Sequence, residues 1–90
     1  MLQPKVLEVM PLPGYKVLLT FETGEKKLFD VTPYINGDWF GKLKDISLFN
    51  SVHVVGWTIE WAGGQDIAPH ELYEDSVPIR FGEDIGSVLQ

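Results

Sequence analysis

The sequence predicts a small α+β domain in which β-hairpins and two or three short helices share one hydrophobic core. Segments of alternating apolar and polar residues, typical of half-buried strands, flank turns that contain glycine. Prolines that follow a threonine or an alanine indicate the starts of short helical turns. The chain has 90 residues, 44% hydrophobic and 12% aromatic, which is enough for one core. We expect a single domain over residues 1–76 and a tail over residues 77–90 that either adds a strand or frays.

A β-hairpin is expected in the first third of the chain. Residues 6–10 have the pattern of a first strand, which ends at the proline- and glycine-rich segment 11–14. Residues 15–21 form the next strand, and residues 22–24 form a loop whose glycine suits a positive φ. Residues 26–31 return as the partner strand.

Cross-strand pairing predicts the register of this hairpin. A three-residue loop places Lys16 opposite Asp30, whereas a two-residue loop would place Val17 opposite Asp30. The first register is expected because it joins opposite charges and leaves apolar residues facing one another. Its apolar pairs are Val17 with Phe29, Leu18 with Leu28 and Tyr15 with Val31.

Two short helices are expected after the hairpin. Thr32 is placed as the N-cap of a helical turn that begins at Pro33. Asp45 is placed as the cap of a second helix that ends at Phe49. The residues between them, 38–41, are interpreted as a loop rich in aromatic side chains.

A second hairpin and a third helical turn are expected in the rest of the chain. Residues 52–55 and 58–61 form strands on either side of Gly56, and residues 66–67 extend this pairing. Pro69 then begins a helical turn, because proline is favoured at the first helical position.

The net charge of −6 lies in the second half of the chain. Residues 1–45 contain six lysines and six acids, whereas residues 46–90 contain seven acids and a single base, Arg80. An acidic surface repels phosphate backbones, so direct binding to nucleic acid is not expected, and it favours a basic partner. The alternative is that the charge serves only to keep a small protein soluble.

The composition also indicates the cellular compartment. The chain has no cysteine, which excludes a disulfide framework and a cysteine-based zinc site. Neither a signal peptide nor a run of the ~20 apolar residues that span a bilayer is visible in the sequence. We therefore expect a cytoplasmic protein without membrane contact.

Asp66 and His70 are the candidates for chemistry. In the plainer interpretation Asp66 caps the helical turn that begins at Pro69. In the alternative, Asp66 and His70 form a carboxylate–histidine pair for acid–base work or, with His53, a metal site. No serine lies in a Gly-x-Ser-x-Gly motif, and Gly63-Gly64 lacks the residues of a phosphate loop. We expect no catalytic, cofactor-binding or metal-binding residues and no cofactor.

Aromatic residues are the candidates for protein contacts. Trp57, Ile59 and Trp61 share one face of an expected strand, where they form either core or an exposed aromatic patch. Trp39 and Phe40 are placed in a loop, where burial is less obligatory. They are the preferred candidates for an interface anchor.

Strand edges offer a second route to association. The expected strands at residues 6–10 and 79–81 leave backbone groups unpaired at the edges of a small open sheet. Through such an edge the chain would pair with a second copy, as a homodimer, or with a strand of another protein.

Several short motifs in fixed order resemble domain-of-unknown-function family 2442. They are Phe29-Asp30-Val31, Pro33-Tyr34, Leu43, Phe49, Thr58-Ile59-Glu60-Trp61, Asp66-Ile67-Ala68-Pro69 and Leu72-Tyr73. The resemblance implies an antiparallel sheet with short helices packed on one side and no assigned active site. It also implies two contexts: some members look like antitoxin-like partners of a small toxin-like protein, and longer members carry a helix-turn-helix.

The leading hypothesis is a protein-interaction domain, the antitoxin-like partner in a two-protein bacterial system. Glu71, Glu74 and Asp75 would face a basic partner, and Trp39 and Phe40 would supply the apolar anchor. One alternative is a small hydrolase or metal-dependent enzyme that uses the carboxylate–histidine pair described above. The other is a regulatory module of a helix-turn-helix protein.

Overall fold

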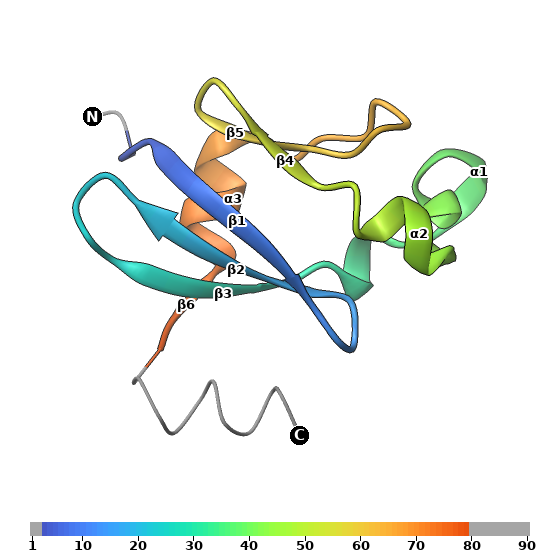
Figure 1. The fold of residues 1–90 in the computed structure, drawn as a ribbon, viewed down its shortest axis with the longest axis horizontal. Helices are drawn as coiled ribbons and strands as arrows, with labels where there is room; N and C mark the ends of the chain where they lie inside the picture. Colours follow the sequence, from blue (N-terminus) through green and yellow to red (C-terminus); the bar gives the residue numbers. More distant parts are fainter. Residues whose placement is uncertain (1–2, 80–90) are drawn as a thin grey trace.

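The computed structural model describes residues 3–79, which form a small α+β fold (Figure 1). One antiparallel sheet has the strand order β1-β2-β3-β6, and a separate hairpin pairs β4 with β5. The strands are β1 (Val6–Leu12), β2 (Lys16–Phe21), β3 (Lys26–Asp30), β4 (His53–Val55), β5 (Thr58–Glu60) and β6 (Val77–Pro78). The α-helices are α1 (Gly37–Phe40), α2 (Ile46–Phe49) and α3 (Pro69–Asp75), with 3-10 turns at Thr32–Tyr34 and Gly41–Lys44. The predicted fold class is confirmed.

The register of the β2–β3 hairpin is the predicted one. Lys16 lies opposite Asp30, and Val17 opposite Phe29, with Leu18 and Leu28 forming the next pair. The Phe21 N–H donates to the Glu25 carbonyl at 2.9 Å and closes the three-residue loop, where Gly24 has φ 91°. The prediction succeeded because charge pairing and apolar pairing favour the same register.

Strand β1 is longer than predicted. It was expected to end before Pro11, but it continues through Leu12 and pairs with β2 along its whole length. Proline lacks a backbone N–H and is tolerated in a strand at the edge of a sheet. The reversal into β2 is made by the next residues, where Gly14 has φ 81° and Tyr15 has φ 61°.

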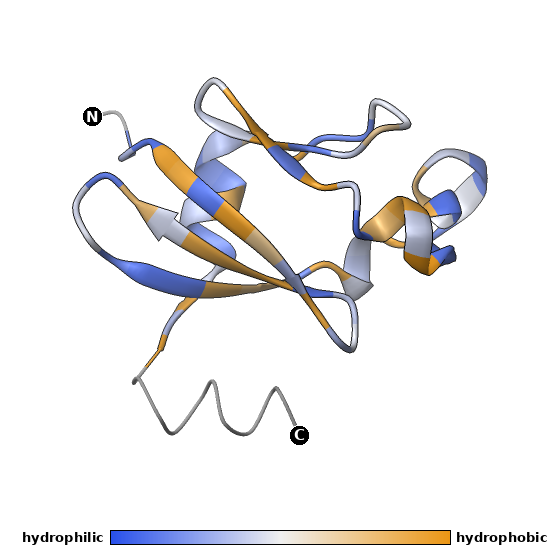
Figure 2. Cartoon of the chain, in the orientation of Figure 1, coloured by the Kyte–Doolittle hydropathy of each residue, from blue (hydrophilic) through white to orange (hydrophobic). Residues whose placement is uncertain are grey.

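The core lies between one face of the four-stranded sheet, called here the inner face, and the elements packed on it. Val17, Leu19 and Phe29 point from the sheet into this core and are at most 1% exposed. Helix α3 contributes Leu72, and the β4–β5 region contributes Ile59 and Trp61. The Trp61 indole N–H donates to the Phe49 carbonyl at 2.9 Å and ties this region to α2. In Figure 2, β1 is mainly hydrophobic with one strongly hydrophilic position, and β3 is hydrophilic at its start and hydrophobic after it.

Two short helical segments differ from the prediction. Thr32 was expected to cap a helix, but the cap position is Val31, and the Thr32 N–H donates to the Asp30 carboxylate at 3.0 Å. Residues 38–41 were expected to be a loop, but α1 forms there because the Gly41 N–H donates to the Gly37 carbonyl and closes a turn. The predicted Asp45 cap of α2 is confirmed, since its carboxylate accepts the Ser47 N–H at 2.9 Å.

The chain after α3 adds a strand to the sheet. In β6, Val77 pairs with Leu28, and the Ile79 N–H donates to the Lys26 carbonyl at 3.2 Å. The expected strand over residues 79–81 falls mostly outside the described residues, as does the rest of the tail. Within residues 3–79, no helix is long and apolar enough to cross a membrane.

Candidate interaction surface

Helix α3 carries three of the five predicted contact residues. It begins at Pro69, whose fixed φ suits the first helical position, and Leu72 anchors it in the core. It carries Glu71, which is half-buried, and Glu74 and Asp75, which are exposed, and no lysine or arginine. Glu74 and Asp75 lie in the last turn, where the helix dipole disfavours negative charge. Glu71 lies in the first turn, where the dipole favours negative charge, so only Glu74 and Asp75 carry this local electrostatic cost.

Tyr34 connects this helix to the predicted aromatic anchor. Its hydroxyl donates to the Glu71 carboxylate at 2.9 Å and lies 3.5 Å from that of Asp75. Burial and the two carboxylates raise the pKa of Tyr34 to about 12, so the phenol is neutral at physiological pH. The ring of Phe40, which is half-buried, lies 6.5 Å from that of Tyr34. We call Tyr34, Phe40, Glu71, Glu74 and Asp75 the α3 surface.

A buried lysine fixes the C-terminal end of α3 on the sheet. The Lys27 side chain is on the inner face and 6% exposed, and its ammonium donates to the Tyr73 carbonyl. The ammonium also lies 3.7 Å from the centroid of the Tyr73 ring, a cation–π contact. A cation here offsets the negative end of the helix dipole.

The Tyr73 hydroxyl completes this attachment by donating to both oxygens of Glu25 at 2.9 Å. Hydrogen bonds from Thr23 and Tyr73 lower the pKa of Glu25, and the bond to Glu25 raises the pKa of Tyr73. These contacts attach α3 to the β2–β3 hairpin.

Trp39 belongs to a different part of the surface. It is 50% exposed in α1, and the edge of its ring packs over Gly64, where an added Cβ would lie 3.4 Å from the ring. The Trp39 carbonyl accepts a hydrogen bond from the Gln65 side chain at 2.9 Å, and the Lys42 ammonium lies 5.6 Å from the ring. These contacts connect Trp39 to the loop after β5, and none of them joins it to α3.

In the described part of the chain, no hydrogen bond or ion pair joins Asp66 to His70. Asp66 was expected to cap α3, but the cap position is Ala68, and no side chain donates or accepts there. The backbone of Asp66 instead bridges to Glu60 of β5, which explains why it does not turn back to the helix. His53 is exposed on β4 with its ring nitrogen 3.3 Å from Glu60, while His70 is exposed on α3. The described part of the chain contains no group of three His, Cys, Asp or Glu residues arranged to hold a metal.

The expected stripe of Trp57, Ile59 and Trp61 is only partly correct. Ile59 and Trp61 are fully buried, as core residues are. Trp57, in contrast, lies in the turn between β4 and β5, where Gly56 has φ 57°, and is 38% exposed. The turn takes it off the strand, and the Lys5 ammonium lies 5.2 Å from its ring.

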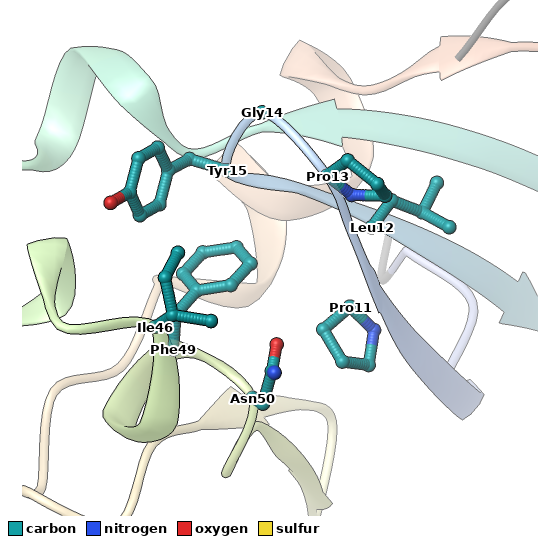
Figure 3. Close-up of a pocket in the computed structure, with 8 residues that line it drawn as sticks. All are labelled: Pro11, Leu12, Pro13, Gly14, Tyr15, Ile46, Phe49 and Asn50. Carbon is teal, nitrogen blue, oxygen red and sulfur yellow. The ribbon is translucent and has the colours of Figure 1, made fainter. Parts of the chain in front are cut away.

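A cleft of about 440 Å³ opens between the β1–β2 turn and α2 (Figure 3). Tyr15, Ile46 and Phe49 line one side of it, and Pro11 and Pro13 line the other. None of its lining residues is acidic or basic, and the Tyr15 hydroxyl already donates to the Lys44 carbonyl. The cleft therefore offers shape and apolar surface rather than a general acid or base.

Comparison with known proteins places the chain in a family. The model of the family described as "Protein of unknown function (DUF2442)" matches residues 6–78, which run from the start of β1 to the end of β6. No curated protein and no solved structure matches the chain. Because the match covers most of the sequence, the chain belongs to the DUF2442 family of proteins of unknown function.

Proposed function

We propose that this chain is a protein-interaction domain that binds a basic protein partner through the α3 surface. The observation that carries the proposal is the set of carboxylates on α3, two of them exposed in a last turn where the helix dipole disfavours negative charge. Lys27 offsets part of that cost from the sheet, and a partner rich in lysine and arginine would offset more of it on binding. Complementary charge would also speed encounter and select the partner.

The rings of Tyr34 and Phe40 give the same surface an apolar component. Interfaces place aromatic residues at their centre and charged residues toward their rim. Phe40 is half-buried against Tyr34, so a partner side chain would complete a contact that is already ordered. We propose the finer role of antitoxin-like member of a two-protein bacterial system because some family members resemble partners of a small toxin-like protein.

Co-expression with the product of the neighbouring gene, followed by size-exclusion chromatography, tests this proposal. The wild-type chain is expected to co-elute with that product. The double variant Glu74→Lys/Asp75→Lys is expected to weaken the complex about tenfold or more, because each rim charge contributes of order 0.5–1 kcal/mol.

A matched control has the same change in net charge away from the α3 surface. Glu60→Lys/Asp66→Lys alters a residue of β5 that faces His53 and one that precedes the opposite end of α3. This control should bind as the wild type does. The proposal fails if the wild type does not co-elute, or if both double variants weaken the complex equally.

A further inference from the structure

The face of the sheet opposite the core carries a row of apolar side chains that crosses all four strands. Met10 lies opposite Leu18, Leu18 opposite Leu28, and Leu28 opposite Val77. We call these four residues the outer row. Met10 is 49% exposed and Val77 62% exposed, while Leu18 and Leu28 are half-buried.

The described elements that form the core pack on the other side of the sheet. Leu18 alternates along β2 with Val17 and Leu19, which are fully buried on the inner face. Helix α3 is on that inner face, with Leu72 in the core, and the β4–β5 hairpin lies beyond β1 (Figure 1). Aligned apolar side chains on an exposed sheet face are typical of a surface that packs against another sheet.

The charges beside the outer row sum to zero on a chain whose net charge is −6. Glu8, Thr20 and Lys26 are aligned on one side of the row, and Leu12, Lys16 and Asp30 on the other, where Leu12 is buried. This face therefore gains little from a strongly basic or acidic partner. It suits a surface of its own kind, which brings one acid and one lysine to each side.

The geometry points to a symmetric dimer in which the outer rows of two copies of this chain pack face to face. A two-fold axis parallel to the strands and between β2 and β3 places Met10 over Val77 of the second copy. The same axis places Leu18 over Leu28 of the second copy. It also places Lys16 over Asp30 of the second copy, so apolar and charged positions match together.

The surface shape of the outer face fits the same dimer. A hollow of about 250 Å³ lies beside the outer row and is lined by Glu8, Val9, Met10, Leu18, Thr20 and Lys26. Val77, the most exposed large hydrophobic residue in the described part of the chain, stands at the opposite end of the row. The two-fold axis brings Val77 of each copy toward the hollow of the other.

The sheet edges are less suited to association than the face. Strand β1 has a bulge at Leu7 and contains Pro11, which has no N–H to donate. At the other edge, β6 is two residues long and contains Pro78. Bulges, prolines and very short strands are features that prevent edge pairing in natural proteins. A dimer formed through the outer face does not require backbone pairing at these edges.

Sedimentation equilibrium on the full chain at about 100 µM, together with charged substitutions in the outer row, tests the inference. The wild type is expected at twice the monomer mass, and Met10→Lys and Val77→Glu should each raise the dissociation constant tenfold or more. The double variant Met10→Lys/Val77→Glu should regain the dimer, because each new lysine then faces a new glutamate of the second copy. Ile46→Lys, a control at a 58% exposed position on α2, should leave the dimer intact.

Other outcomes would overturn the inference. Failure of the double variant to regain the dimer would exclude this two-fold arrangement. A monomeric wild type that dimerises only after residues 80–90 are removed would show that the chain's own C-terminal segment occupies the outer row. Circular dichroism of each variant confirms that the fold is retained. Because the α3 surface is on the other side of the sheet, loss of the dimer and loss of partner binding are separately measurable.

Discussion

The two faces of the four-stranded sheet have the same strands and the same register but opposite environments. On the inner face, Leu19 and Phe29 are at most 1% exposed and packed by α3 and by the β4–β5 region. On the outer face, Leu18 and Leu28 are half-buried, and Met10 and Val77 at the ends of the row are about half exposed or more.

The difference in burial between the two faces indicates that the inner face stabilises the fold and that the outer face is available for binding. The inner face supplies the burial that stabilises a small domain, since each large apolar side chain removed from water contributes about 1.5–3 kcal/mol. The outer row gains much less of this stabilisation within one chain, so its apolar character is not explained by the fold alone. A surface that the fold does not need is one that association can use.

The largest expected effect compares two adjacent leucines of β2. Leu19→Ala should lower the free energy of unfolding by about 2–5 kcal/mol, because it opens a cavity in a fully packed site. Leu18→Ala should lower it by about 1 kcal/mol or less when measured at a dilution where the chain is monomeric. Urea denaturation followed by tryptophan fluorescence measures both. Equal losses of unfolding free energy in the two variants would show that Leu18 is packed as tightly as Leu19.

Two adjacent lysines of β3 make the same comparison for polar contacts. Lys27→Met keeps the apolar stem on the inner face but removes the ammonium from the Tyr73 carbonyl and ring, and it should cost about 1–3 kcal/mol. Lys26→Met on the outer side loses only an exposed bond to Thr20 and should cost about 0.5 kcal/mol or less. Denaturant midpoints of the two variants would contradict this expectation if they were equal.

The sequence predicted the features that depend on residues close together in the chain or directly opposite each other in a hairpin. The β2–β3 register follows from Lys16 opposite Asp30 and from apolar pairs, and the Asp45 cap follows from a short polar side chain before an apolar turn. The predicted register also places Lys27 opposite Leu19, on the inner face. That position was an available signal for the buried lysine, and sequence reasoning did not use it.

Contacts between distant segments could not be predicted in this way. Tyr34 meets Glu71 across 37 residues, and no local periodicity encodes that pair. Trp57 was placed on a strand because alternation continues through it, but the two-residue turn of the β4–β5 hairpin takes it out of the sheet. The outer row needed β6, a strand of two residues with a proline, which falls below what pattern reasoning detects.

The smallest expected effect concerns Tyr34, whose phenol hydroxyl donates to Glu71 of α3. The pKa of Tyr34 is raised to about 12 by burial and by the Glu71 and Asp75 carboxylates, so the folded state favours the neutral phenol. Its stabilisation is fully present below pH 10, the ordinary pKa of tyrosine, and is lost as the pH rises toward 12. Tyr34→Phe should therefore cost about 0.5–1 kcal/mol at neutral pH, with a difference from the wild type that shrinks through this range.

Two measurements follow this titration in the α3 surface. Ultraviolet absorbance of tyrosinate should show one phenol that ionises near pH 12 in the wild type and is missing from Tyr34→Phe. Glu71→Gln should bring that ionisation to lower pH, because it removes the negative charge next to the hydroxyl while leaving an acceptor in place. An unchanged titration in Glu71→Gln would mean that the carboxylate does not hold the Tyr34 hydroxyl. The polar link between the aromatic anchor and the acids of α3 would then be lost, whereas the apolar contrast between the two sheet faces would stand.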